Sequence, residues 1–166
     1  MTSLPLAILH EQPGDAAAID HLHERAFGPG RFARSAYRLR EGVAAAPDLS
    51  FTARVGTLLV GSNRLTPILI GDSPALLLGP LVVDPAFRSK GIGLALLDTS
   101  LKAAELGGHR LVMLVGDEPY YARVGFSRIP NGRVALPGPV DPRRVLWRPL
   151  AEGATEGVGG EARRAA

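Results

Sequence analysis

The segment from Leu76 to Leu106 constrains the fold most, because it reads as a buried strand, a glycine-bearing loop and a helix in immediate succession. Its first part, Leu76–Val83, is an apolar run too short for a typical helix, which predicts a strand buried on both faces. Apolar residues then recur at mostly helical spacing from Ile92 to Leu106, and Gly107 follows, as glycine often does just past a helix.

The loop between this strand and this helix has the composition of an anion site. It reads Arg88-Ser89-Lys90-Gly91-Ile92-Gly93 and leads directly into the helix. The start of a helix leaves backbone N–H groups unpaired, and the aligned peptide dipoles favour negative charge there. Glycines allow a ligand to approach the backbone, and Arg88 and Lys90 add positive charge. The loop therefore predicts a phosphate-binding cradle, although a glycine-rich turn that only joins strand to helix is the simpler alternative.

The identity of the phosphate ligand is narrowed by comparing motifs. A Walker loop needs Gly-Lys followed by Ser or Thr, which is absent, and a dinucleotide fingerprint needs a third glycine where this chain has Leu96. The phrase LGPLVVDPAFRSKGIGLALL, with Arg-x-x-Gly-x-Gly after the strand, resembles motif A of the GNAT acetyltransferase superfamily. In that family the loop holds the pyrophosphate of acetyl-CoA.

A second phrase downstream, GDEPYYARVGF, strengthens the resemblance. Many GNAT chains carry a tyrosine, a short polar step and then Gly-Phe at this point, and Tyr121 holds that position relative to Gly125-Phe126. The phrase looks most like the YhbS-type branch of acetyltransferases. Taken alone, Tyr120 and Tyr121 are more simply explained as two aromatics that pack a short helix onto the sheet. If Tyr121 is the proton donor, we expect Tyr120 to face the acceptor side or the core.

The resemblance implies a fold, an activity and a set of site residues. The fold is α/β (α+β), a mixed and mostly antiparallel central sheet flanked by helices, with a splayed pair of central strands. The activity is transfer of an acetyl group from acetyl-CoA to a primary amine of a small molecule or peptide, and Tyr121 is the proton donor to the leaving thiolate. The implied cofactor-binding residues are Leu81, Val82, Val83, Arg88, Ser89, Lys90, Gly91, Ile92 and Gly93.

Two other functional classes keep part of this pattern. A non-catalytic acyl-CoA-binding or sensing module on the same fold would keep the loop but would not need Tyr121 within reach of the thioester. A plain nucleotide-phosphate binder would need neither Tyr121 nor Pro80. No general base is evident, because Leu76–Val83 contains no carboxylate and Asp84, directly before Pro85, has the position of a structural residue.

Pro80 is anomalous inside an apolar central strand, because proline cannot donate a ladder hydrogen bond. It predicts a bulge, and the resemblance implies that the neighbouring strand, Arg110–Val115, splays away below it. The pantetheine arm of the cofactor would then pair with the backbone of Leu81–Val83 like an added strand. The alternative is that Pro80 simply opens a separate strand, Leu81–Val83.

Around this centre the pattern predicts a short first strand at Leu4–Leu9 and helices at Ala16–Phe27, Phe32–Glu41 and Glu118–Val124. It also predicts strands at Ser50–Val55, Thr57–Leu65, Ile68–Ile70, Arg110–Val115 and Val145–Leu150. Residues 1–150 form a single GNAT-like domain in this interpretation, and residues 151–166, almost without bulky side chains, form a disordered tail.

Bulk properties exclude several classes. The chain has 166 residues, no cysteine and a formal net charge of +3, which suits an anionic ligand but is not the dense basic run of a nucleic-acid-binding arm. We predict no metal site, no nucleic-acid partner and no membrane association, since no apolar run approaches the ~20 residues of a membrane span. A cytoplasmic location is the default expectation. The partners are acetyl-CoA and an amine acceptor, with a homodimer left open.

Overall fold

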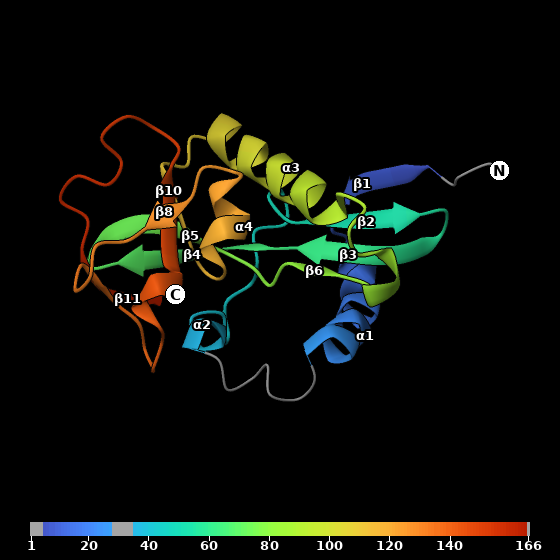
Figure 1. Cartoon of the computed structure of the whole chain (residues 1–166), viewed down its shortest axis with the longest axis horizontal. Coiled ribbons are helices and arrows are strands. Elements are labelled where there is room, and N and C mark those ends of the chain that lie inside the picture. The colour runs from blue at the N-terminus through green and yellow to red at the C-terminus, as the bar shows by residue number, and fades with distance from the viewer. Residues whose placement is uncertain (1–4, 28–34, 166) are drawn as a thin grey trace.

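The computed structural model describes residues 5–27 and 35–165, which form two β-sheets with helices packed against them (Figure 1). The helical segments are η1 (Pro13–Asp15), α1 (Ala16–Phe27), α2 (Ser35–Arg38), η3 (Pro85–Phe87), α3 (Ile92–Leu106), α4 (Glu118–Ala122) and η4 (Pro142–Arg144). The strands are β1 (Leu6–His10), β2 (Phe51–Val55), β3 (Leu58–Asn63), β4 (Leu65–Ile70), β5 (Ser73–Leu78), β6 (Val82–Val83), β7 (Leu111–Val115), β8 (Ser127–Arg128), β9 (Val134–Ala135), β10 (Val145–Pro149) and β11 (Gly160–Arg164).

The first sheet has the strand order β1-β2-β3-β6 and is antiparallel throughout. Helix α3 packs on one face of it and α1 on the other (Figure 1). The alternation of side chains along a strand explains why both faces are buried. In β3, Leu59 packs in a cluster with Ile19 of α1, whereas the next residue, Val60, packs with Ile92 and Leu96 of α3.

The second sheet has the order β8-β10-β7-β5-β4-β11-β9. It is antiparallel except for the β5–β7 and β9–β11 pairs, which are parallel. One of its clusters contains Met113, Trp147 and Ile68, and another packs Leu76, Val112 and Leu114 against Leu97 of α3. Helix α3 therefore contributes to the cores of both sheets.

The two sheets are joined by one long bent hairpin. In the first sheet Ser62 pairs with Val82, and in the second Leu65 pairs with Leu78. Two residues, 63 and 64, therefore lie opposite three, 79–81, which is a bulge of one extra residue at the position of Pro80. The predicted bulge is confirmed, and the Gly79-Pro80 peptide within it is cis.

Leu76–Val83 is consequently not one strand but two, β5 and β6, that lie in different sheets. Strand β5 pairs in parallel with β7 at Leu76↔Val112 and Leu77↔Met113, whereas β6 pairs with β3. Beyond the bulge β6 no longer pairs with β7, so the predicted splay between Leu76–Val83 and β7 is present. The mixed, mostly antiparallel sheet flanked by helices is likewise as predicted.

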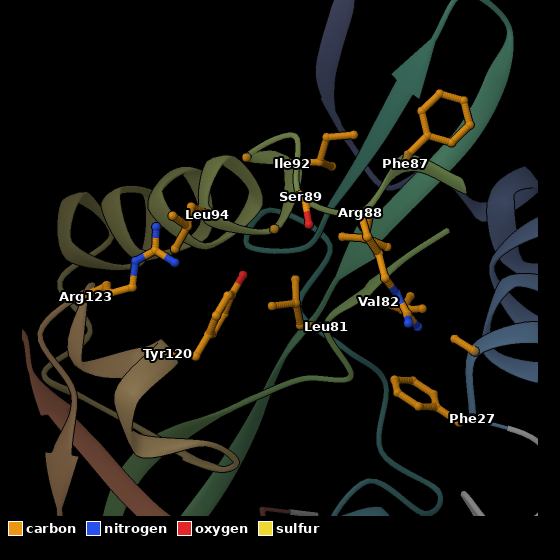
Figure 2. A pocket seen from close by; sticks show the side chains of 14 residues that line it. Phe27, Leu81, Val82, Phe87, Arg88, Ser89, Ile92, Leu94, Tyr120 and Arg123 are labelled. Carbon is orange, nitrogen blue, oxygen red and sulfur yellow. The ribbon is translucent and has the colours of Figure 1, made fainter. Parts of the chain in front are cut away.

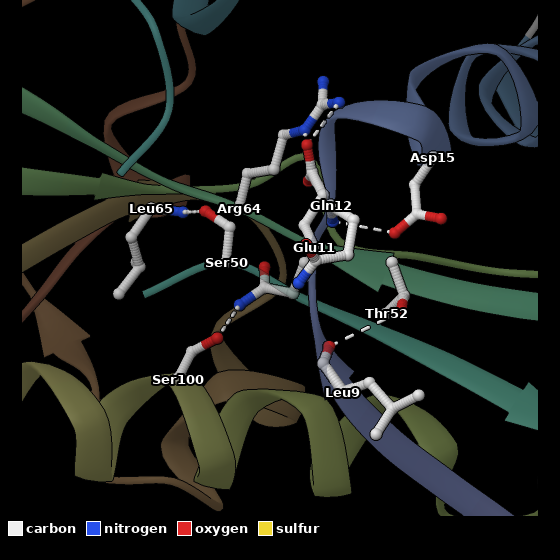
Figure 3. A network of polar contacts seen from close by, with 10 residues as sticks. Leu9, Glu11, Gln12, Asp15, Ser50, Thr52, Arg64, Leu65 and Ser100 are labelled. Atoms are coloured by element: carbon white, nitrogen blue, oxygen red, sulfur yellow. Dashed lines mark hydrogen bonds and ion pairs between the residues drawn. The ribbon is translucent and has the colours of Figure 1, made fainter. Parts of the chain in front are cut away.

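Polar contacts of Arg64 and Asn63 hold the bent hairpin in position. Arg64, between β3 and β4, forms a two-point ion pair with Glu11, with Nε–Oε1 and Nη2–Oε2 distances of 2.9 and 3.1 Å (Figure 3). Its backbone carbonyl accepts a hydrogen bond from Gly79 N–H (2.8 Å), which ties the two halves of the bulge together. A buried hydrogen bond from Asn63 Nδ2 to Ser100 Oγ (3.1 Å) joins the end of β3 to α3.

The predicted disordered tail is wrong for the residues that the structure describes. Residues 160–164 form β11, which pairs with β4 through Ala162↔Ile70 and its neighbours. Arg133 secures the preceding turn by donating from Nη2 to the Thr155 carbonyl (2.8 Å). The prediction failed because it looked for bulky side chains, whereas Val158 and Ala162 bury small apolar side chains against a sheet edge that the sequence did not reveal.

Helices α1 and α3 begin and end at the predicted residues. The predicted helix Phe32–Glu41 is shorter, since α2 covers Ser35–Arg38, and its predicted start at Phe32 lies outside the described residues. The predicted strand Thr57–Leu65 is divided at Arg64 between β3 and β4. Within residues 5–27 and 35–165, no helix combines the length and apolarity needed to cross a bilayer.

Candidate active site

The loop before α3 has the backbone geometry of an anion site. Ser89 and Gly91 both have left-handed backbone, with φ values of +63° and +79°. Ser89 is the only non-glycine residue with positive φ in the described part of the chain, and such conformations concentrate at binding sites. Gly91 is the N-cap of α3 and supplies no side-chain hydrogen bond, and the helical ladder begins with Ala95 N–H to the Gly91 carbonyl (3.1 Å). The N–H groups of residues 92–94 therefore stay outside the ladder.

A cavity of about 490 Å³ opens at this helix start (Figure 2). Eight of the nine predicted cofactor-binding residues line it, and the exception is Lys90. It extends from the loop along β6 to α1, where Ala26 and Phe27 border it, and to α4 on the other side. The structure thus brings the predicted loop and the predicted strand backbone together in one cavity.

Strand β6 presents an open edge toward this cavity. It is the last strand of the first sheet, and its described ladder partner, β3, lies on one side only. Leu81, Val82 and Val83 all border the cavity. An extended ligand arm can therefore add to this edge as a further strand does, through backbone hydrogen bonds.

The charged residues that line the cavity are Arg88 and Arg123, and no carboxylate is among its described lining residues. A cavity with two guanidinium groups and a helix N-terminus favours an anionic ligand. Asp84 instead has a structural role, as expected, because its carboxylate accepts from Ala86 N–H (2.9 Å) and pairs with Arg25 (3.2 Å).

Tyr120 lines this cavity, and its ring also packs against the core cluster that contains Leu97 and Val112. Its hydroxyl points at the start of α3 (Figure 2) and lies where a Cβ on Gly93 would stand. Arg123, one helical turn later, places its guanidinium carbon 5.8 Å from the Tyr120 ring centroid. Burial raises the pKa of Tyr120, and the Arg123 charge opposes this effect. Sequence reasoning missed Arg123, although its i, i+3 spacing from Tyr120 signalled a shared face.

Tyr121 lies outside the described lining of this cavity. Its ring packs edge-on against Tyr120 and Phe126, with centroid distances of 5.0 and 6.0 Å. A Cβ on Gly116 would come within 2.5 Å of its Cε2 atom, so the ring lies directly on the residue that follows β7. Burial is the main cause that raises its pKa, to about 12, and Tyr120 adds to the effect.

The two tyrosines thus project from α4 toward different surroundings. Tyr120 faces the phosphate loop, and Tyr121 faces the carboxyl end of β7. Among the described residues no group of His, Asp and Glu has the arrangement of a metal site.

Comparison with known proteins places this geometry in context. The acetyltransferase (GNAT) domain profile matches residues 47–128, which run from the turn before β2 to the end of β8. The N-acetyltransferase YjhQ of Escherichia coli K12 is 34% identical over 117 residues, which is 68% of this chain and 65% of YjhQ. The chain thus spans just under two thirds of the length of that relative. The N-acetyltransferase YhbS of the same organism is 28% identical over 90% of each protein.

Two solved structures of GNAT acetyltransferases are also similar to this chain. The crystal structure of YhbS from Escherichia coli in complex with CoA superposes with a TM-score of 0.84 and 25% identity, covering 99% of this chain and 92% of that one. A GNAT family acetyltransferase from Brucella melitensis in complex with acetyl-CoA gives a TM-score of 0.60 and 29% identity, covering 86% of this chain and 94% of that one.

Proposed function

Since the chain belongs to the GNAT acetyltransferase family, we propose that it transfers the acetyl group of acetyl-CoA to a primary amine. The observation that carries this proposal is the cavity that unites the loop Arg88–Gly93 with the open edge of β6. That arrangement suits a ligand with a phosphate-rich end and an extended amide-bearing arm, which is the chemistry of acetyl-CoA.

The loop would hold the pyrophosphate of the cofactor. The N–H groups of residues 92–94 stay outside the helical ladder and are available as donors beside the left-handed turn at Ser89–Gly91, and the helix dipole would add to the attraction. Arg88 supplies charge beside it, and Arg123 supplies a second cation across the cavity. Lys90, outside the lining, would contribute only long-range attraction.

The pantetheine arm would run along β6 toward the bulge. Its amides can exchange hydrogen bonds with the backbone of Leu81–Val83, so that the thioester arrives near Pro80 and α4. A backbone N–H of β6, at Val82, would polarise the thioester carbonyl as charge develops on its oxygen.

Tyr121 would assist departure of the thiolate. With a pKa of about 12 its hydroxyl stays protonated at neutral pH and is available as a hydrogen-bond donor. Thiols have pKa values of about 8.5, so complete proton transfer from such a weak acid to the thiolate is uphill. We therefore assign Tyr121 the donation of a hydrogen bond that strengthens as the sulfur becomes negative, with the proton delivered fully only in concert with loss of a proton from the attacking amine.

The test is a thiol-release assay with acetyl-CoA across a panel of amines, amino acids and peptides. Amine-dependent release of free CoA thiol, with a matching acetylated product by mass spectrometry, is the expected result. Calorimetry run in parallel measures acetyl-CoA binding. Tight binding with no amine-dependent thiol release would replace the enzyme with the alternative, a non-catalytic acyl-CoA-binding module.

A further inference from the structure

A second concentration of positive charge lies at the carboxyl ends of β5 and β7, on the opposite side of the bulge from the phosphate loop. Arg40, in the turn after α2, is half-buried and places Nη2 2.9 Å from where a Cβ on Gly79 would stand. Gly79 is the first residue after β5 and the first residue of the bulge. The guanidinium group of Arg40 therefore lies against the backbone at the point where the two sheets separate.

Arg144 approaches the neighbouring strand end. Its backbone carbonyl accepts a hydrogen bond from Gly116 N–H (2.9 Å), and Gly116 is the first residue after β7. The Tyr121 ring lies on the same Gly116. Arg144 has an exposed side chain, so its guanidinium group remains accessible to solvent.

The topology brings these groups to one edge. Strands β5 and β7 are parallel neighbours with Leu77 opposite Met113, so continuing the register sets Gly79 beside Val115, next to Gly116. The guanidinium group of Arg40 at Gly79, and the Tyr121 ring and the Arg144 carbonyl at Gly116, therefore lie at neighbouring strand ends where the central strands splay. The electrostatics agree, since the positive charges of Arg144 and Arg40 both lower the pKa of Tyr121, against the larger effect of burial and the smaller effect of Asp117.

We propose that Arg40 and Arg144 bind a carboxylate of the acceptor, so that the substrate is an amine that also carries a carboxylate group. This inference rests on the proposed acetyl transfer. The cofactor's own phosphates are accounted for at the other end, by the start of α3 and by Arg88 and Arg123. A thioester lying along β6 ends near the bulge, so an anion bound beyond it belongs to the acceptor.

Arg40 and Arg144 would also favour the neutral, reactive form of the acceptor amine. Amine attack needs the neutral form, and nearby guanidinium groups disfavour an ammonium ion and so lower the pKa of the acceptor amine. A carboxylate on the acceptor offsets the repulsion that the two arginines exert on an amine without one. The arrangement therefore selects for the carboxylate and favours the neutral form of the amine.

The test compares acceptor pairs that differ only in carboxylate against carboxamide, such as glycine and glycinamide, β-alanine and β-alaninamide, and dipeptides and their amides. We expect the best acceptor to be an acid with at least ~10-fold higher kcat/KM than its amide, as loss of a charge-assisted hydrogen bond implies. The amide carries the less basic amine, so this preference would run against intrinsic reactivity.

The variants Arg40→Gln and Arg144→Gln should each reduce the ratio of kcat/KM for the acid to that for its amide, chiefly through a higher KM for the acid, with the acetyl-CoA affinity little changed. Arg40→Lys keeps the charge and should keep part of the preference, and Arg144 is exposed enough to be replaced without disturbing the core. Arg38→Gln is the matched control, because Arg38 lies on α2 but donates to the Pro137 carbonyl (2.8 Å), away from Gly79.

Equal use of acid and amide by the wild-type protein, or a preference that persists in both glutamine variants, overturns the carboxylate site while leaving acetyl transfer intact. Absence of transfer to every amine, with acetyl-CoA bound, is instead a failure of the proposed function itself.

Discussion

The two sheets differ in how they are assembled and in what they carry. In the first sheet β6 lies next to β3, and β3 lies next to β2. The loop Arg88–Gly93 comes shortly after β6 in the sequence, so its position is set by a strand close to it in the chain. The second sheet is built from strands between Leu65 and Arg164. At the carboxyl ends of its central strands β5 and β7, Arg40, Tyr121 and Arg144 come from three separate segments to contact Gly79 or Gly116.

The difference between the two sheets shows which kind of site a short sequence motif can locate. On the first sheet the proposed binding groups are backbone N–H groups whose direction follows from local turns and a helix start. On the second sheet they are side chains whose meeting depends on distant strand pairing. We expect variants of the first sheet to change cofactor binding and variants of the second sheet to change chemistry or stability.

The largest expected effect is that of Tyr121→Phe. It keeps the ring against Gly116 and removes the hydroxyl, so turnover should fall by ~10²–10⁴-fold, as for loss of a general acid, with acetyl-CoA affinity unchanged. The loss should be smaller for acyl donors with a more acidic thiol. Steady-state kinetics and calorimetry check both statements. Tyr120→Phe is the matched variant, and it should weaken acetyl-CoA binding mildly with turnover retained. The reverse outcome would mean that Tyr120 is the donor.

The next largest effect concerns the stability of the second sheet. Ala162→Asp places a carboxylate at a position that is 4% exposed, inside the cluster with Ile70 and Met113. It should lower the free energy of unfolding by about 3 kcal/mol or more, because an unpaired charge is buried. Denaturant unfolding measures this. The neighbouring Arg163→Ala, which loses an exposed ion pair to Asp72 (3.1 Å) and a hydrogen bond to the Gly71 carbonyl (3.2 Å), should cost less than about 1 kcal/mol. Equal stability of the Ala162→Asp protein would restore the view of residues 151–166 as a disordered tail.

On the first sheet, Gly93→Val should weaken acetyl-CoA binding by roughly 10- to 100-fold, because its side chain would collide with the Tyr120 hydroxyl at the mouth of the loop. Calorimetry on the folded variant is the measurement. Gly14→Ala is the control, since a Cβ there has no neighbour within 4 Å. In a Gly93→Ala background, Tyr120→Phe removes the obstructing oxygen and should recover part of the affinity. Unchanged affinity in folded Gly93→Val would remove the pyrophosphate assignment.

The smallest expected effect is a pH dependence of stability in the second sheet. Burial raises the pKa of Tyr121 from 10.0 to about 12, so between these values the unfolded chain has lost a proton that the folded chain retains. The contribution of Tyr121 to stability is therefore complete below pH 10 and is lost as the pH rises to about 12. It should amount to about 3 kcal/mol. The free energy of unfolding of wild type should fall more steeply over this window than that of Tyr121→Phe, and parallel curves would contradict the burial of this hydroxyl.

The local elements could be predicted because their signals are local. Helix α3 is specified by its apolar spacing and by glycines at both ends, and the bulge is specified by Pro80. Strand β11 could not be predicted, since its small residues carry no signal without the edge of β4 beside them. The environments of Tyr120 and Tyr121 were assigned only in part, because rotation along a short helix separates adjacent residues but does not say which neighbour each will meet.

The sequence by itself determined the cofactor half of this protein. A strand that stops before Asp84, two left-handed turn positions and a helix start without a side-chain cap all lie within one short segment of the chain. Only the tertiary structure decided the other half. Arg40 lies against Gly79, and the Arg144 carbonyl bonds to Gly116, although the residues of each pair are far apart in the chain. The two glycines follow β5 and β7, which pair in parallel before the one-residue bulge. Strand pairing is set by the burial of whole faces rather than by any short segment, and so the residues that it assembles carry no shared motif.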